Sequence, residues 1–150
     1  MRSVCMFVCV TLLTIVGLAQ PALAIPAFSD VFKKEFLDNH PNKKFAEEVN
    51  GKDENGKPLK CLICHQGFKV KKARNAYGDQ LDLLLDRKTD AKNVEKIVEA
   101  IKKVNEMHVD PKDDKSETYG DRLKAGKWPA GDLESLKKEP PKSDDKPAEK

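Results

Sequence analysis

The run Cys61-Leu62-Ile63-Cys64-His65 constrains this chain more than any other feature. On one helical turn, positions i, i+3 and i+4 lie on the same face, so the two thiols and the imidazole converge on one object. Two thiols at this spacing form thioethers with the vinyl groups of a haem, while the histidine binds its iron. The run therefore predicts one covalent haem c per chain, with His65 as the proximal iron ligand.

The N-terminus has the pattern of a secretory signal peptide. An apolar stretch over residues 4–19 follows a basic residue, and Ala22-Leu23-Ala24 is a small-x-small cleavage site. We predict a signal peptide over residues 1–24, a mature chain that begins near Ile25, and a periplasmic or secreted protein. An uncleaved membrane anchor is the alternative, but the stretch is short for a span and Pro21 breaks it. No other segment is apolar enough to cross a membrane.

Cleavage would leave Cys61 and Cys64 as the only cysteines, so the mature chain has no disulfide framework. A thiol–disulfide enzyme is an alternative, but such enzymes place C-x-x-C near a βαβ pattern, and none is visible. A zinc site needs four ligands, usually from two separated pairs, and adjacent Cys64 and His65 rarely complete one tetrahedron. The charge is nearly balanced, with 28 Lys and Arg against 25 Asp and Glu, which does not favour a nucleic-acid partner.

Apolar residues recur at helical spacing, and no alternating run indicates a strand. We predict an all-α fold with a haem domain over residues 25–130 and a disordered, charged tail over 131–150, where from Pro140 on nothing is available to bury. The predicted helices are Phe28–Leu37, a short one capped by Asn42, one capped by Asp79, one from Thr89 or Asp90 to about Met107, and a short one at Asp121–Ala125.

With these helices around the motif, the chain resembles a small monohaem cytochrome c of class I. The resemblance covers roughly residues 28–130 in helix order, but only the C-x-x-C-H run is specific. It implies helices before and after the motif, a haem c held by Cys61, Cys64 and His65, and a methionine from a later loop at the second axial position. It also implies a protein that carries single electrons between redox partner proteins rather than an enzyme.

Two departures from that family stand out. The family usually has a proline soon after the motif, whose carbonyl accepts a hydrogen bond from the proximal imidazole, but this chain has no proline between Leu59 and Asp110. Another carbonyl, near Tyr77, is therefore predicted to take that role. The family also places a substantial helix after its methionine, whereas Met107 is followed by a polar stretch and one short candidate helix.

Four possibilities remain for the second axial position. Met107 is the first choice, because it is the only methionine left after cleavage and lies 42 residues beyond His65. His108 is the second, because it falls on the apolar stripe of the preceding helix if that helix reaches it. His40 is the third, and an open position the last. An occupied position fits an electron carrier, whereas an open one would indicate a peroxidase-like enzyme or a gas-binding sensor. A non-haem interaction protein with an accidental motif is a further alternative.

Basic residues follow the motif at Lys69, Lys71, Lys72 and Arg74. They form either a solvated loop or a docking surface that steers an acidic redox partner, and Arg74 suits a haem propionate.

A short echo links Tyr77-Gly78-Asp79-Gln80-Leu81 to Tyr119-Gly120-Asp121-Arg122-Leu123. Five residues do not establish a repeat. They predict a helix start used twice, with tyrosines that flank the haem as the functional alternative.

Overall fold

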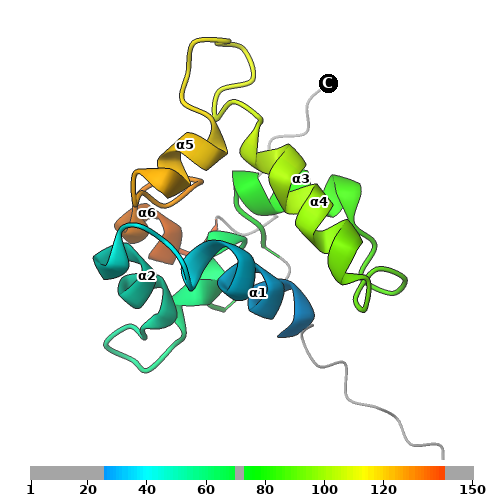
Figure 1. Ribbon diagram of the computed structural model, residues 1–150. Coiled ribbons are helices and arrows are strands. Elements are labelled where there is room, and N and C mark those ends of the chain that lie inside the picture. The colour runs from blue at the N-terminus through cyan, green and yellow to red at the C-terminus, as the bar shows by residue number, and fades with distance from the viewer. Residues whose placement is uncertain (1–25, 70–72, 141–150) are drawn as a thin grey trace, which may run out of the picture.

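The computed structural model describes residues 26–69 and 73–140 of the chain, which fold into helices (Figure 1). Three isolated bridge pairs are the only extended pairing in this described part, so the all-α prediction is confirmed there. The predicted signal peptide and residues 141–150 lie outside the described residues. The elements are α1 (Pro26–Phe32), η1 (Lys33–Leu37), α2 (Lys43–Asn50), η2 (Leu59–Ile63), α3 (Ala76–Leu84), α4 (Val94–Asn105), α5 (Tyr119–Lys124) and α6 (Leu133–Lys137).

Helix α4 lies at the centre of the packing. Its residues Ile97, Ala100, Ile101 and Val104 are buried, and their spacing of three and four places them on one stripe. Helices α1, α3 and α5 pack against α4, and Figure 1 shows α3 beside it. The short helix η2 carries the first residues of the C-x-x-C-H run and packs instead against α2 and α6. The motif therefore lies where these two groups of helices meet.

The first predicted helix, Phe28–Leu37, is present but changes its pitch. The chain is α-helical to Phe32 and then makes a π turn, in which the N–H of Asp38 donates to the carbonyl of Lys33 at 2.9 Å. The rings of Phe32 and Phe36 stack with centroids 5.5 Å apart. The predicted Asn42 cap of α2 is confirmed, since its side chain accepts from the N–H of Phe45 at 3.1 Å.

Two predicted caps are wrong. Helix α3 begins before Asp79, because the side chain of Asn75 accepts from the N–H of Gly78 and caps it. Helix α4 is capped by Asn93 rather than by Thr89 or Asp90. Asp90 instead accepts from the N–H of Asp86 and from Lys96 Nζ, so it closes the loop before α4. Helix α3 thus begins earlier than predicted, and helix α4 begins later. In both cases several polar residues could cap the helix, and contacts with other segments decide which one does.

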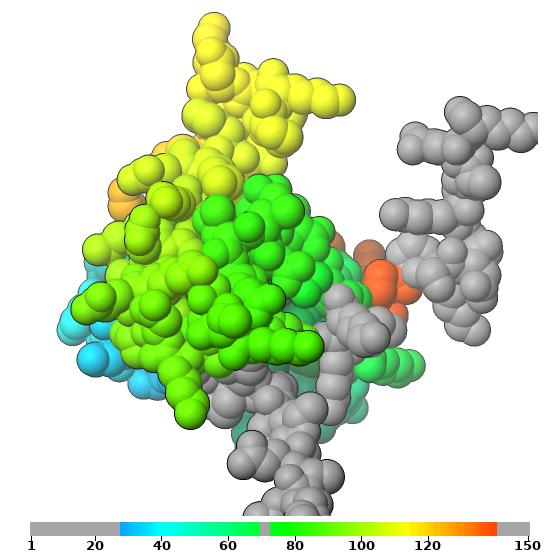
Figure 2. All heavy atoms as spheres, turned by 90° about the vertical axis from the view of Figure 1, so that its right-hand side faces the viewer, coloured from blue at the N-terminus to red at the C-terminus, as the bar shows by residue number. Residues whose placement is uncertain are grey.

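The end of α4 also differs from the prediction. The helix ends at Asn105, with Glu106 as its C-cap, and so does not reach residues 107 and 108. The helical phase that placed His108 on the buried stripe therefore has no basis, because that phase required a continuous helix. The following segment, residues 106–118, forms a loop that extends from the body of the molecule (Figures 1 and 2). Helix α5 then begins at Tyr119, two residues before the predicted start at Asp121.

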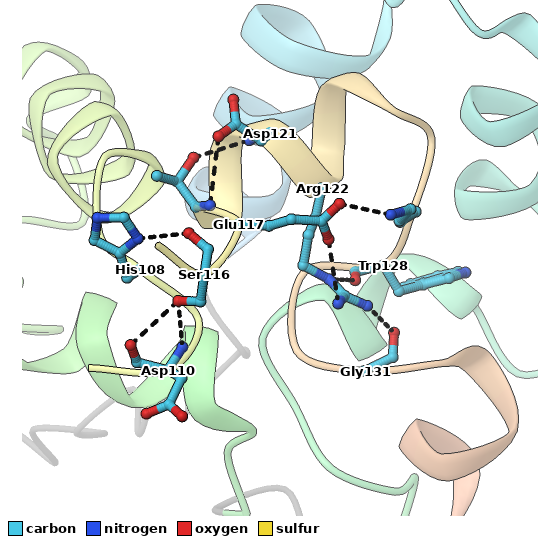
Figure 3. Close-up of polar contacts among 10 residues, drawn as sticks. His108, Asp110, Ser116, Glu117, Asp121, Arg122, Trp128 and Gly131 are labelled. Carbon is cyan, nitrogen blue, oxygen red and sulfur yellow. Dashed lines mark hydrogen bonds and ion pairs between the residues drawn. The ribbon is translucent and has the colours of Figure 1, made fainter. Parts of the chain in front are cut away.

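The predicted start of the disordered tail, at residue 131, lies too early in the chain. Arg122 donates to the carbonyls of Trp128 and Gly131, and the chain then turns into α6 (Figure 3). Leu136 of α6 is only 1% exposed and belongs to the core. The sequence-based boundary at residue 130 failed because a five-residue helix with one buried leucine leaves almost no periodic signal. Among the described residues, no helix has both the length and the apolar character that crossing a membrane requires.

Candidate functional site

The C-x-x-C-H run folds as a tight turn. The N–H of Cys64 donates to the carbonyl of Cys61 at 3.4 Å, and the N–H of His65 donates to the same carbonyl at 3.0 Å. Leu62 and Ile63 are 0% and 2% exposed and anchor the turn in the core. With those two side chains buried, Cys61, Cys64 and His65 line one cavity of about 360 Å³. The turn thus places all three predicted attachment residues at the same hollow.

The imidazole of His65 is held by one backbone carbonyl. Its Nδ1 lies 2.9 Å from the carbonyl oxygen of Ala73. A carbonyl oxygen can only accept, so Nδ1 carries the proton and Nε2 keeps a lone pair for a metal. A metal-binding histidine is typically oriented in this way through its other nitrogen. The predicted substitute for the missing proline carbonyl therefore exists, but it lies at Ala73 rather than nearer Tyr77.

A short backbone pairing holds that carbonyl in place. His65 and Arg74 form an isolated antiparallel bridge. The N–H of Gln66 also donates to the carbonyl of Ala73 at 3.2 Å, and the N–H of Asn75 donates to the carbonyl of Cys64 at 3.2 Å. The chain therefore returns to the motif after the basic loop, and the imidazole is oriented by backbone that is itself fixed.

Asn75 clamps the motif from the other side, and the sequence analysis did not identify this role. The residue is 5% exposed, and its Nδ2 donates to the carbonyls of Leu62 at 2.8 Å and Ile63 at 3.1 Å. Its Oδ1 meanwhile caps α3 by accepting from Gly78 at 2.9 Å. One side chain thus ties the start of α3 to the carbonyls of the motif. Asparagine is a preferred cap, and that signal alone pointed to position 75.

Gly78 allows α3 to approach the motif closely. A Cβ built at this position would overlap the carbonyl oxygen of Cys64, and its next contacts would be other backbone atoms of Cys64. Backbone cannot move aside as the end of a flexible side chain can, so only glycine fits here. The close approach brings Leu81 and Leu85 to the wall of the cavity.

The interior of the cavity is apolar and its charged residues lie toward solvent. Its volume falls in the range of about 300–1,000 Å³ that is typical of sites for small molecules and cofactors. The apolar lining residues come from α1, η1, η2, α3 and α4, and they are Phe28, Phe32, Leu37, Ile63, Leu81, Leu85, Ile97 and Ile101. The charged lining residues are Lys33, Lys60, Arg74, Arg87 and Asp82, all of them exposed or half-buried.

The thiol of Cys64 is neutral in these surroundings. Burial raises the pKa of Cys64 to about 12, with a smaller contribution from the nearby Cys61. A thiol with so high a pKa is a poor thiolate ligand and a poor attacking group in disulfide exchange. Within the described residues, no group of three or more His, Cys, Asp or Glu side chains could hold a bare metal ion.

The three candidates for the second axial position all lie outside the lining of this cavity. His108 is in the loop after α4, where its Nδ1 donates to the carbonyl of Ser116 at 2.6 Å (Figure 3). The backbone of Met107 is fixed by the N–H of Tyr119, which donates to its carbonyl at 3.0 Å. His40 is 7% exposed, and its Nε2 donates to the carbonyl of Leu123 at 2.7 Å. The structure thus brings Cys61, Cys64 and His65 together but not these three.

The basic loop divides into two parts. Lys69 is exposed, while Lys71 and Lys72 lie outside the described residues. Arg74 reaches the cavity and forms an ion pair with Asp82. The loop begins against the C-terminal end of the described chain, because the N–H groups of Phe68 and Lys69 donate to the carboxylate of Glu139.

The two tyrosines of the sequence echo form part of the core rather than of the cavity wall. Their rings make an edge-to-face contact with centroids 5.3 Å apart, and the hydroxyl of Tyr77 donates to Asn105 Oδ1 at 2.9 Å. Burial holds the pKa of Tyr77 well above its usual range. Neither tyrosine lines the cavity, so the arrangement favours the helix-start interpretation over a contact with the cofactor.

Comparisons of the chain with protein-family models, with curated proteins and with solved structures found no match.

Proposed function

We propose that this chain is an exported monohaem c-type cytochrome that carries single electrons between redox partners. The observation that supports this most is the joint position of Cys61, Cys64 and His65 on one apolar cavity, with His65 Nδ1 bonded to a carbonyl. The donor set fits the group, because two thiols and one oriented imidazole are what a covalent haem requires. The haem would supply the one-electron chemistry at its iron.

The residues around the cavity would set the conditions for that chemistry. Cys61 and Cys64 would form the thioether bonds, and the fixed ring of His65 would present Nε2 to the iron. The buried side chains of Phe32, Ile97 and Ile101 would surround the bound group with carbon, which would lower the local dielectric and so tune the reduction potential. The protein would thus provide attachment, orientation and an apolar pocket.

The charges at the mouth indicate the kind of partner. Lys33, Lys60 and Arg87 border the cavity together with the Arg74–Asp82 pair, so basic groups outnumber acidic ones there. An acidic redox protein would be attracted to this side by long-range charge steering, and the attraction would weaken with salt. Arg74 also has the planar donor fork that suits a propionate.

Expression with export into a compartment that attaches haem tests the proposal. We expect a pyridine haemochrome spectrum of the c type, a mass gain of one haem that survives acid–acetone extraction, and a one-electron redox titration. Cys61→Ala and Cys64→Ala should each leave at most one thioether, and His65→Ala should change the axial ligation. A matched control is Lys69→Ala, next to the motif but outside the cavity lining, which should retain full attachment. A haem that extracts freely from the wild type would refute the proposal.

A further inference from the structure

The sequence contains a closed set of residues that could provide a second axial ligand of the usual kind. It has three histidines and three methionines. Two of the methionines lie within the first 25 residues, in the predicted signal peptide. Only His40, His65, Met107 and His108 remain, and the structure describes all four. The segments outside the description after residue 25 contain neither residue type.

Of these four, only His65 lines the cavity that contains the two cysteines. Met107 is tied to the ends of α4 and α5, since its N–H donates to Val104 and its carbonyl accepts from Tyr119, both at 3.0 Å. Met107 also packs against the core, although it lies outside this cavity. The structure therefore fixes the backbone of this residue at the junction of α4 and α5, and its side chain is not part of the cavity lining.

The two other histidines are also engaged elsewhere. The Nδ1 of His108 and the carbonyl of Ser116 hold the loop of residues 106–118 together (Figure 3). His40 borders a separate cavity between η1 and α5, and its Nε2 bridges to Leu123 across 83 residues of sequence. Recruiting His40 would break a hydrogen bond at either ring nitrogen, since Nε2 donates to a buried carbonyl and Nδ1 accepts from a backbone N–H. Among the described residues no hydrogen bond holds the Nε2 of His108, and what separates this ring from the site is its place in the loop, outside the cavity lining.

The described lining offers few replacement ligands, and its one carboxylate, Asp82, forms an ion pair with Arg74. The two lysines of the lining, Lys33 and Lys60, have side chains 45% and 38% exposed, and they lie near Asp38 and Asp30 respectively. The buried lining side chains, such as Phe32, Leu37 and Ile97, contain only carbon beyond the backbone.

We propose that the sixth position of the iron is open in this protein and that, in the ferrous state, it binds a small neutral diatomic ligand of the carbon monoxide or nitric oxide class. This inference rests on the proposed haem attachment at Cys61, Cys64 and His65, and it adds ligand binding to the proposed electron transfer, because an iron with an open position can still change its oxidation state by one electron. Apolar walls favour a neutral ligand, because they cannot solvate an anion. They also lack a buried donor to stabilise bound dioxygen and an acid–base pair to cleave a peroxide, so peroxidase activity is not expected.

Carbon monoxide is the probe. The holoprotein is first shown by pyridine haemochrome to carry covalent haem, and it is then reduced with dithionite. We expect a high-spin, five-coordinate spectrum before addition, and a Soret shift that saturates at one carbon monoxide per haem. The variants Met107→Leu, His108→Ala and His40→Ala should preserve the spin state. The affinity of the first two should stay within about twofold of wild type, as for changes remote from a site.

A substitution in the cavity wall should change the carbon monoxide affinity, unlike the variants above. Ile97→Phe adds volume inside the cavity and should weaken carbon monoxide binding by about tenfold. Val94→Phe is the matched control, because Val94 is on the same helix but is 50% exposed and does not line the cavity, and it should bind like wild type. If Ile97→Phe does not fold, the ligation variants above decide the question alone.

The possible failures are distinguishable. A low-spin ferrous spectrum that becomes high-spin in Met107→Leu, His108→Ala or His40→Ala would identify a protein ligand and overturn the inference. A low-spin spectrum in every variant would overturn it as well, since another side chain must then occupy the position. In both cases covalent haem would be present and the proposed electron carrier would stand. Absence of covalent haem would refute the proposed function and this inference together.

Discussion

Helices α3 and α5 share three residues in their first turns but hold different parts of the molecule. Tyr77-Gly78-Asp79 lies in the first turn of α3, and Tyr119-Gly120-Asp121 lies in the first turn of α5. In both, the glycine lies against a backbone carbonyl of another segment, and the two tyrosine rings meet edge to face. The shared residues therefore have one shared purpose, which is to start a helix in close contact with neighbouring backbone.

The difference lies in what each helix start contacts. Gly78 approaches the carbonyl of Cys64 in the motif, whereas Gly120 approaches that of Asn105 at the end of α4. The α3 cap, Asn75, is buried and also donates to carbonyls of the motif turn. The α5 cap, Thr118, is half-buried and forms a reciprocal capping box with Asp121. The same local sequence thus builds the candidate site in one place and the supporting frame in the other.

The glycine pair includes the largest expected effect, that of Gly78→Ala. Gly78→Ala should lower the free energy of unfolding by about 3 kcal/mol or more, because its Cβ meets the backbone of Cys64 and neither group can yield. Gly120→Ala places its Cβ 2.8 Å from the carbonyl oxygen of Asn105, and we expect about 1–2 kcal/mol, partly offset by the helix preference of alanine. Urea denaturation of the purified protein measures both changes.

The absorption spectrum should also distinguish the two glycine variants. Only Gly78→Ala should alter the absorption spectrum of the proposed haem, because only Gly78 contacts the motif. Equal losses of stability with unchanged spectra in both variants would mean that α3 does not position the site.

The caps should come next. Asn75→Ala removes the cap of Gly78 and the donor to the carbonyls of Leu62 and Ile63, so we expect a loss of about 2–4 kcal/mol in unfolding free energy. Thr118→Ala removes a half-buried cap whose side-chain hydrogen bond stays within its own helix start, and it should cost about 1 kcal/mol. Asn75→Asp separates the two roles, because it keeps the acceptor for Gly78 but loses the donor. Thermal denaturation that ranks Asn75→Asp with the wild type would show that Asn75 acts as a cap only.

These pairs show which parts of the fold could be predicted from the sequence. The stripe of Ile97, Ile101 and Val104 repeats at helical spacing, so α4 was identified, and its burial is confirmed. Its start was not, because Thr89, Asp90 and Asn93 are all good caps and only the contacts of Asp90 with Asp86 and Lys96 decide among them. Local preference creates candidates, and tertiary contacts choose one.

In the candidate site, too, some residues could be predicted from the sequence and others could not. Cys61, Cys64 and His65 were identified because the side chains carry their own signature, and the structure places them on one cavity. The carbonyl of Ala73 could not be identified, because every residue has a carbonyl and its role depends on the bridge between His65 and Arg74. The first-choice axial ligand, Met107, remains an untested prediction that rested on the family resemblance, and the structure places it outside the cavity lining.

The tyrosines should show a smaller effect. Tyr77→Phe keeps the ring contact but leaves Asn105 Oδ1 without its donor, and we expect a loss of about 1 kcal/mol in unfolding free energy. Tyr119→Phe is the control, because its hydroxyl has no hydrogen-bond partner in the described part of the chain, and it should stay within about 0.5 kcal/mol of wild type. A double variant tests additivity, and an effect equal in both single variants would mean that the hydrogen bond to Asn105 adds nothing.

The smallest effect concerns acid stability at the start of α5. Hydrogen bonds from the side chain and then the backbone of Thr118 hold the pKa of Asp121 below its reference value of 3.8. A carboxyl group with a lowered pKa in the folded state stabilises the protein above its unfolded pKa, and that contribution disappears as the pH falls through the folded pKa. Asp121→Asn should therefore lower the melting temperature slightly at neutral pH, and the gap from wild type should close as the pH falls below about 4. Because Asp121 is fully exposed, salt should shrink the gap as well. Thr118→Ala should remove most of this pH dependence, since it removes the side chain that lowers the pKa of Asp121 most. A difference in melting temperature between Asp121→Asn and wild type that stays unchanged in acid would mean that packing, rather than the charge of Asp121, stabilises the helix start.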